Sequence, residues 1–131
     1  MARFKKDSNV VILGTDGVPV YGTTKTYERA FITVGSGGAL ATDIVAATAS
    51  KQVFVVAANI DCDGNNTFTW QTGTTDALSG AKDLAAATPL VYPHANVPEA
   101  AWFATVAGKA LMGVVATTAV NTNIEVVYYK E

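Results

Sequence analysis

Apolar and polar residues alternate along short stretches of this chain, most clearly near its middle and at its end. In Thr67–Gln71, Phe68 and Trp70 share one face of an extended segment, while threonine and glutamine share the other. In Ile124–Tyr129 every second residue, through Tyr128, is apolar or aromatic. A period of two residues is typical of a half-buried strand. The pattern therefore predicts two such strands, with Phe68, Trp70 and Tyr128 in the core.

Other stretches rich in β-branched and aromatic residues predict further strands. They are Val10–Leu13, Val18–Tyr21, Thr23–Val34, Thr42–Ala49, Lys51–Ile60, Leu90–Tyr92, Trp102–Thr105 and Ala110–Ala116. Residues 72–79 are predicted as a loop with a short edge segment. A helix is difficult to place, because Thr88 and Pro89 end the helix-forming segment Ala81–Ala87 within about two turns.

Turn residues recur roughly every 8–12 positions, which is typical of an all-β sandwich or jelly roll. We therefore expect one all-β domain over residues 10–131, a jelly-roll-like β-sandwich of about eight short antiparallel strands. Residues 1–9 are polar and basic and are predicted to be a flexible N-terminal arm.

The composition excludes several classes of protein. The chain has 131 residues, of which 50% are hydrophobic and 15% charged, and its net charge is −2. Disorder requires the reverse balance, and a nucleic-acid binder of this size should be clearly basic. A charge-free stretch such as Ala110–Ile124 is shorter than the roughly 18 residues of a membrane span. No apolar segment near the N-terminus resembles a secretory signal. We expect a soluble protein made inside the cell, with neither nucleic acid nor membrane as partner.

The low charge also bears on the surface. A folded monomer of 13.6 kDa exposes about 6,500 Å². Surfaces that stay monomeric usually carry charges on about 25–35% of their residues. The surface is therefore expected to be rich in threonine and alanine, or partly covered by another protein, or both.

No group of residues indicates catalysis or metal binding. His94 and Cys62 are the only residues of their types, which excludes an intrachain disulfide and a thiolate metal cluster, and neither lies in a nucleophile motif. Asp61–Asn65 resembles the start of a calcium loop, but its glycine comes too early, and Thr72 stands where glutamate is needed. We predict a hairpin there whose Asp and Asn side chains bond their own backbone. No enzymatic activity and no cofactor are expected.

The last two-thirds of the chain carries a series of small motifs. They are Ile44–Val53, the alternating Thr67–Gln71, Gly73–Gly80, Leu90–Pro93, the segment Trp102–Leu111 with its Val-Ala-Gly-Lys-Ala-Leu ending, and Ile124–Tyr129. In this order they resemble the small head decoration (cement) proteins of tailed bacteriophages. The chain departs from that pattern in its first forty residues and at Ala95–Ala101.

The resemblance implies a structural virion protein on the outer capsid surface, made in the bacterial cytoplasm. It implies that the protein cements neighbouring major capsid proteins and is itself a homodimer or homotrimer. An alternative is a tail, baseplate or fibre-associated sandwich that binds host glycans through exposed aromatic residues such as Trp102. A small enzyme using Cys62 or His94 and a calcium-stabilised adhesion domain remain further alternatives.

Two segments are predicted to contact the partner, because loops on rigid sandwiches often carry function. The first is the N-terminal arm, with Arg3, Lys5 and Lys6 meeting an acidic surface and Phe4 as anchor. The second is the glycine-rich loop Gly35–Gly38 together with the preceding segment Thr23–Arg29. Its residues are Tyr27, Arg29, Gly35, Gly37 and Gly38.

Overall fold

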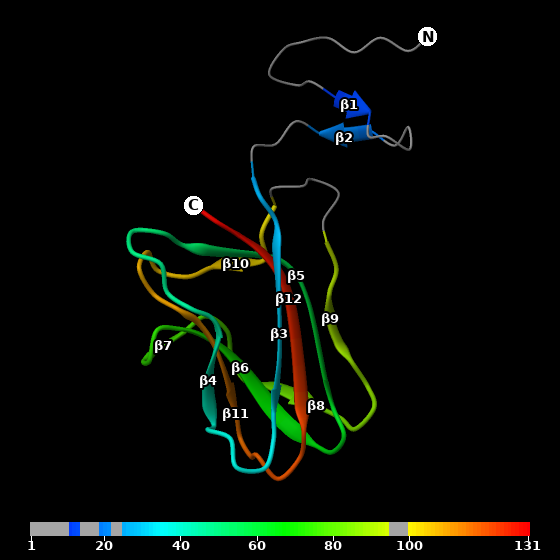
Figure 1. Cartoon of the computed structure of the whole chain (residues 1–131). Helices are drawn as coiled ribbons and strands as arrows, with labels where there is room; N and C mark the ends of the chain where they lie inside the picture. Colours follow the sequence, from blue (N-terminus) through cyan, green and yellow to red (C-terminus); the bar gives the residue numbers. More distant parts are fainter. Residues whose placement is uncertain (1–10, 14–18, 22–24, 95–99) are drawn as a thin grey trace.

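The computed structural model describes residues 11–13, 19–21, 25–94 and 100–131 (Figure 1). The predicted arm at residues 1–9 lies outside them. The described residues contain strands and turns and no helix, and they form two antiparallel sheets that share one core. The predicted all-β sandwich is thus confirmed. Two short strands, β1 (Val11–Leu13) and β2 (Pro19–Tyr21), pair with each other in a separate small sheet.

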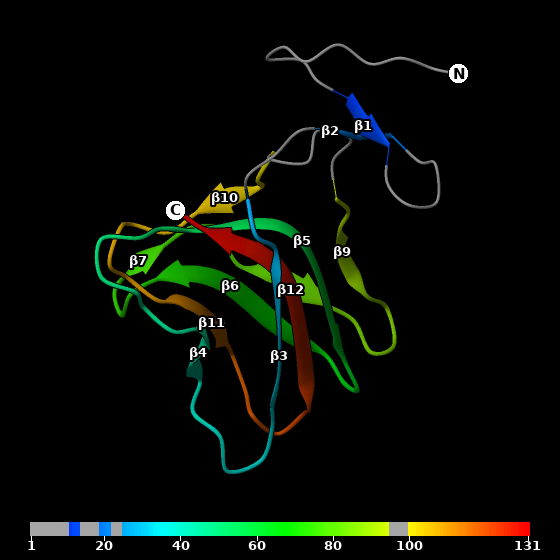
Figure 2. The ribbon, with the colours of Figure 1, turned by 45° about the horizontal axis from the view of Figure 1, so that its top comes forward.

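Each large sheet contains five strands. The first sheet consists of β3 (Glu28–Val34), β12 (Thr122–Lys130), β5 (Val53–Cys62), β9 (Leu90–Tyr92) and β10 (Phe103–Ala104). The second consists of β4 (Ala41–Val45), β11 (Leu111–Val115), β6 (Asn66–Thr72), β7 (Asp76–Ala77) and β8 (Lys82–Leu84). Figures 1 and 2 show the two sheets facing each other across the interior.

The strand pairing is nested. β3 pairs with β12, β4 with β11, β5 with β9 and β10, and β6 with β7 and β8. The chain thus resembles one long hairpin, which the additional pairs β12–β5 and β11–β6 roll into two sheets. This is the arrangement of a jelly roll. The strands occupy eight positions, because β9 and β10 share one position beside β5, and β7 and β8 share one beside β6.

The core lies where the alternation predicts. Phe68 and Trp70 are fully buried, with ring centroids 4.7 Å apart in an edge-to-face contact, and Tyr128 is buried as well. Gly113 on β11 leaves room for this packing, because a Cβ there would lie 2.7 Å from the Phe68 ring. The core predictions for these three aromatic residues are therefore confirmed.

One irregularity changes which side chains share a face. Val127 lies opposite Ala57 and Tyr128 opposite Val55, so Val56 has no partner on β12. This is a β-bulge, in which two residues of one strand oppose one of the other. Beyond the bulge Tyr129 lies opposite Phe54, and the two rings stack on the outer face of the sheet.

The segment with helix-forming residues is not helical. Residues 82–84 form β8 against β6, and an isolated bridge joins Ala85 to Thr88. Ala87 has a positive φ of 59° and donates its backbone N–H to the Cys62 carbonyl. Pairing with β6 thus overrides the weak local helix preference.

Candidate interaction surface

The outer face of the first sheet is built from rows of side chains that run across β3, β12 and β5. The first row is polar and consists of Thr33, Asn123 and Asp61. The Thr33 hydroxyl donates to the Asn123 side-chain oxygen at 2.8 Å, and the Asn123 amide donates to the Asp61 carboxylate at 2.8 Å. The polar side chains of this row therefore hydrogen-bond one another within the sheet.

The next row is mixed. Phe31, Glu125, Asn59 and Val91 lie side by side across β3, β12, β5 and β9. Phe31 and Val91, at its two ends, are 62% and 55% exposed, although both are large apolar side chains. Glu125 pairs with the exposed Arg29 at 3.3 Å. The row therefore presents apolar side chains at both margins of the sheet and one ion pair between them.

A shallow groove of about 210 Å³ lies beside this row. Its walls are mainly small or apolar side chains because alanine, valine and proline face outward where β9 passes β5. The lining residues are Ala57, Ala58, Asn59, Val91, Tyr92, Pro93, Glu125 and Val127. Such a surface suits flat contact with another protein better than enclosure of a small molecule.

The last row is aromatic. Phe54 and Tyr129 stack with centroids 4.9 Å apart, and Tyr27 packs edge-on against Tyr129 at 5.9 Å and against His94 at 5.8 Å. The Lys25 ammonium lies 5.5 Å from the centre of the Tyr129 ring, and Lys25 also pairs with the Glu131 carboxylate. Tyr129 is only 5% exposed, although it points away from the core.

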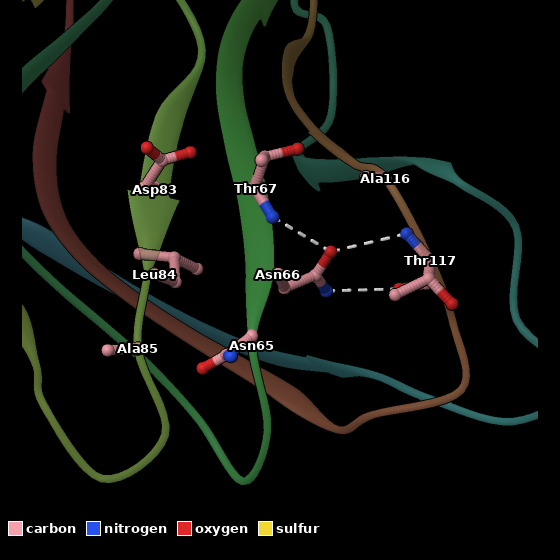
Figure 3. Close-up of a pocket in the computed structure, with 8 residues that line it drawn as sticks. All are labelled: Asn65, Asn66, Thr67, Asp83, Leu84, Ala85, Ala116 and Thr117. Carbon is pink, nitrogen blue, oxygen red and sulfur yellow. Dashed lines mark hydrogen bonds between the residues drawn. The ribbon is translucent and has the colours of Figure 1, made fainter.

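A second hollow, of about 550 Å³, lies over β6 and β8 where β11 ends (Figure 3). It is lined by Asn65, Asn66, Thr67, Asp83, Leu84, Ala85, Ala116 and Thr117. The buried Asn66 carboxamide accepts from the Thr67 and Thr117 backbone N–H groups and donates to the Thr117 carbonyl and the Thr122 hydroxyl. Its side chain is thus fully used in holding β6 to the end of β11, and it offers nothing to a ligand.

The residues predicted to contact a partner do not form one site. Arg3, Phe4, Lys5 and Lys6 lie outside the described residues. Tyr27 directly precedes β3 and Arg29 is its second residue, whereas Gly35, Gly37 and Gly38 follow its end. A strand of seven residues separates the two groups by about 20 Å.

The glycine-rich segment is a tight turn. Gly38 donates its backbone N–H to the Gly35 carbonyl at 2.8 Å, and Gly37 has a φ of +84°. A positive φ at the third position of a four-residue turn favours glycine. Gly35 has a different role, because a Cβ there would lie 2.2 Å from the Asn121 side-chain oxygen. The positive φ thus accounts for glycine at Gly37, whereas a Cβ at Gly35 would require the exposed Asn121 side chain to move.

Cys62 and His94 lie apart. Cys62 is buried at the end of β5, and its thiol donates to the Gly64 carbonyl. His94 packs against Tyr27, past the end of β9. Because Tyr92 lies opposite Ala58, the chain after β9 runs along β5 away from Cys62.

The Asp61–Asn65 hairpin differs in detail from its prediction. The Asp61 carboxylate accepts a hydrogen bond from Asn123 on β12, and the Asp63 carboxylate accepts from Asn121 just before that strand. Neither carboxylate bonds its own backbone. Among the described residues no group of three or more His, Cys, Asp or Glu side chains is placed to hold a metal ion. The same residues include no helix long and apolar enough to cross a membrane.

Trp102, directly before β10, and Phe103, its first residue, point to opposite sides of the sheet. Phe103 packs against Trp70 in the core, with centroids 4.9 Å apart, whereas Trp102 is 51% exposed. The Trp102 indole N–H donates to the Pro93 carbonyl at 2.9 Å, and its ring packs edge-on against Tyr92. Two contacts therefore fix the orientation of an exposed aromatic ring.

Comparison with known proteins identifies no relative: no family model, no curated protein and no solved structure matches the chain.

The sequence predictions omitted Phe31 and Val91, the exposed residues of the mixed row. The exposure of Phe31 could have been predicted from alternation along β3, since Arg29, Phe31 and Thr33 share one face and Ala30 and Ile32 share the other.

Proposed function

We propose that this chain is a structural virion protein that binds the outer surface of a phage capsid and cements neighbouring major capsid proteins. The observation that carries the proposal is the outer face of the first sheet, where Phe31 and Val91 are exposed at the two margins and a shallow, mainly apolar groove lies between them, bordered by Val91. The jelly-roll topology supports it as an analogy, because this architecture recurs in viral capsid proteins.

The chemistry of this face suits attachment without catalysis. Alanine, valine and proline in the groove lose little when water is removed, because they have few polar groups to desolvate. The ion pair between Arg29 and Glu125 is already formed within the sheet. Many copies bound around a symmetric shell would stabilise it by mass action, since each binds the assembled form.

The proposal is tested with Ala57→Arg, which places a long charged side chain in the groove. Ala41→Arg is the matched control, because Ala41 is an exposed alanine at the edge of the other sheet. The purified variants are added to undecorated capsids of the phage that encodes the chain, and bound copies per shell are counted. We expect Ala57→Arg to lower occupancy at least tenfold and Ala41→Arg to leave it unchanged. Equal occupancy for both variants would contradict the proposed face.

Binding to host glycans is a second candidate function, which Trp102 favours. A tryptophan ring that is half exposed and held by contacts to Pro93 and Tyr92 is a preorganised surface for stacking on a sugar. Jelly rolls also occur in lectins. A glycan array probed with the wild-type chain and with Trp102→Ala tests this function. Glycan binding that disappears in the variant while capsid occupancy is retained would support it.

A further inference from the structure

The two sheets have four outer margins, and the strands at these margins differ in how they are protected. The outermost strands are β3 and the β9/β10 position in the first sheet, and β4 and the β7/β8 position in the second. An exposed strand edge presents unpaired N–H and C=O groups that can pair with another chain. Proteins usually protect such edges with short strands, charges, proline or bulges.

Three of the four margins show these protections. β7 and β8 have two and three residues, and Asp76, Lys82 and Asp83 lie on them. β9 and β10 are equally short, and Pro93 follows β9 directly. β4 carries Asp43, and its register with β11 shifts between Leu111 and Met112.

β3 lacks these protections. Its seven residues pair with β12 in seven consecutive register positions without a shift. It contains no proline, and its only charged residues, Glu28 and Arg29, lie at its start. Within the described part of the chain, no strand pairs with the other side of β3 (Figures 1 and 2).

The core beside β3 is also incompletely covered. Ile124 and Val126 on β12 are fully buried, whereas their core-facing neighbours Ile32 and Ala30 on β3 remain partly exposed. Phe31, at the centre of the strand, is 62% exposed on the outer face. Apolar surface is therefore accessible on both faces of this edge strand.

We propose that β3 pairs antiparallel with β3 of a second copy of this chain, around a twofold axis at Phe31. The two first sheets then become one continuous sheet across the dimer. The strand is self-complementary in this register, with Phe31 facing Phe31, Ala30 facing Ile32, and Arg29 facing Thr33 of the other copy. A small residue meets a large one on the core side, two aromatic rings meet on the outer side, and no like charges are opposed.

Because such a contact uses the same strand on both copies, it closes with two chains. A second copy is preferred over an unrelated extended peptide because the match arises from the strand's own sequence. The dimer is proposed for the chain in solution and does not depend on capsid binding. The dimer proposal and the capsid-binding proposal can therefore fail independently.

The first experiment measures the mass of the wild-type chain by sedimentation between about 1 and 100 µM, a range that detects micromolar affinity. We expect a dimer that dissociates on dilution. Phe31→Lys places two like charges at the twofold axis and should raise the dimer dissociation constant at least tenfold. Val91→Lys is the matched control, because Val91 lies in the same row with similar exposure but at the other margin of the sheet. It should leave the dissociation constant unchanged.

The second experiment tests whether residue 31 faces itself. Phe31→Lys and Phe31→Glu should each be monomeric, and an equimolar mixture should recover a dimer containing one copy of each. Circular dichroism of each variant confirms that it is folded, and recovery in the mixture cannot arise from a misfolded chain.

Four results would overturn the proposal. One is a wild-type monomer over the whole concentration range, and another is a trimer, which a twofold strand pair cannot form. A dimer that Phe31→Lys leaves intact would place the contact elsewhere. Folded single variants whose mixture stays monomeric would show that Phe31 does not meet Phe31.

Discussion

Replacement of Gly113 by alanine tests how closely the two sheets pack. Gly113 lies on β11 opposite Trp70, and its φ is not positive, so alanine fits the backbone. The obstacle is steric: the added Cβ would lie 2.7 Å from one ring carbon of Phe68 and 3.1 Å from the Ile44 terminal methyl. Phe68 cannot easily retreat, because it is fully buried and packs against Trp70 at 4.7 Å.

The expected magnitude follows from two opposing effects. Overpacking a core by one methyl group costs about 1–3 kcal/mol. Replacing a strand glycine by alanine regains about 0.5–1 kcal/mol of backbone entropy. The difference between the middles of these two ranges predicts that the free energy of unfolding of Gly113→Ala falls by about 1 kcal/mol. The melting temperature should fall by roughly 4 °C for each kcal/mol in a chain of this length.

Urea denaturation of Gly113→Ala, Phe68→Leu and the double variant measures the contact directly. The smaller leucine side chain should relieve the clash, so the double variant should be more stable than the sum of the single effects predicts, by about 1 kcal/mol. Gly80→Ala is the control, because no atom lies within 4 Å of a Cβ at that position. The reasoning is refuted if Gly113→Ala is as stable as the wild type, or if the two substitutions are additive.

Two further predictions concern buried polar groups. Burial raises the pKa of Tyr128 above its ordinary value of 10.0. The nearby charge of Glu28 and a hydrogen bond to Glu28 raise this pKa further. The folded chain thus holds this proton more tightly than the unfolded chain, and stability should fall as pH rises above 10.0, less steeply in Tyr128→Phe. Urea midpoints against pH measure this, and equal slopes would contradict it. Asn66→Ala leaves both Thr117 backbone groups without their partner and should cost about 2–4 kcal/mol in urea unfolding, whereas the exposed Asn65→Ala should cost almost nothing.

Local pattern was sufficient to predict most strands and the aromatic core. Phe68, Trp70 and Tyr128 lie where a period of two places them, because each strand has one face toward the opposite sheet. Trp102 is half exposed, whereas its neighbour Phe103 packs against Trp70 in the core, as opposite sides of an extended segment require. Such inferences need only the residues of one strand.

Features that depend on distant partners could not be predicted in this way. The bulge at Val56 arises from the register between β5 and β12, which lie far apart in the chain. Residues 82–84 form a strand only because β6 offers them a partner. Likewise, the hydrogen bonds of Asp61 and Asp63 go to Asn123 and Asn121, some sixty residues later.

The positions of the few charges distinguish the two sheets. In the second sheet, charged residues lie on all three of the short outer strands: Asp43 on β4, Asp76 on β7, and Lys82 and Asp83 on β8. In the first sheet, β3 is charged only at its first two positions, and the centre of its edge is Ala30, Phe31 and Ile32. Charges at a strand edge oppose pairing with another chain. The few charged residues thus lie at the margins of the second sheet and are absent from the centre of β3. This distribution favours association through the first sheet and opposes it through the second.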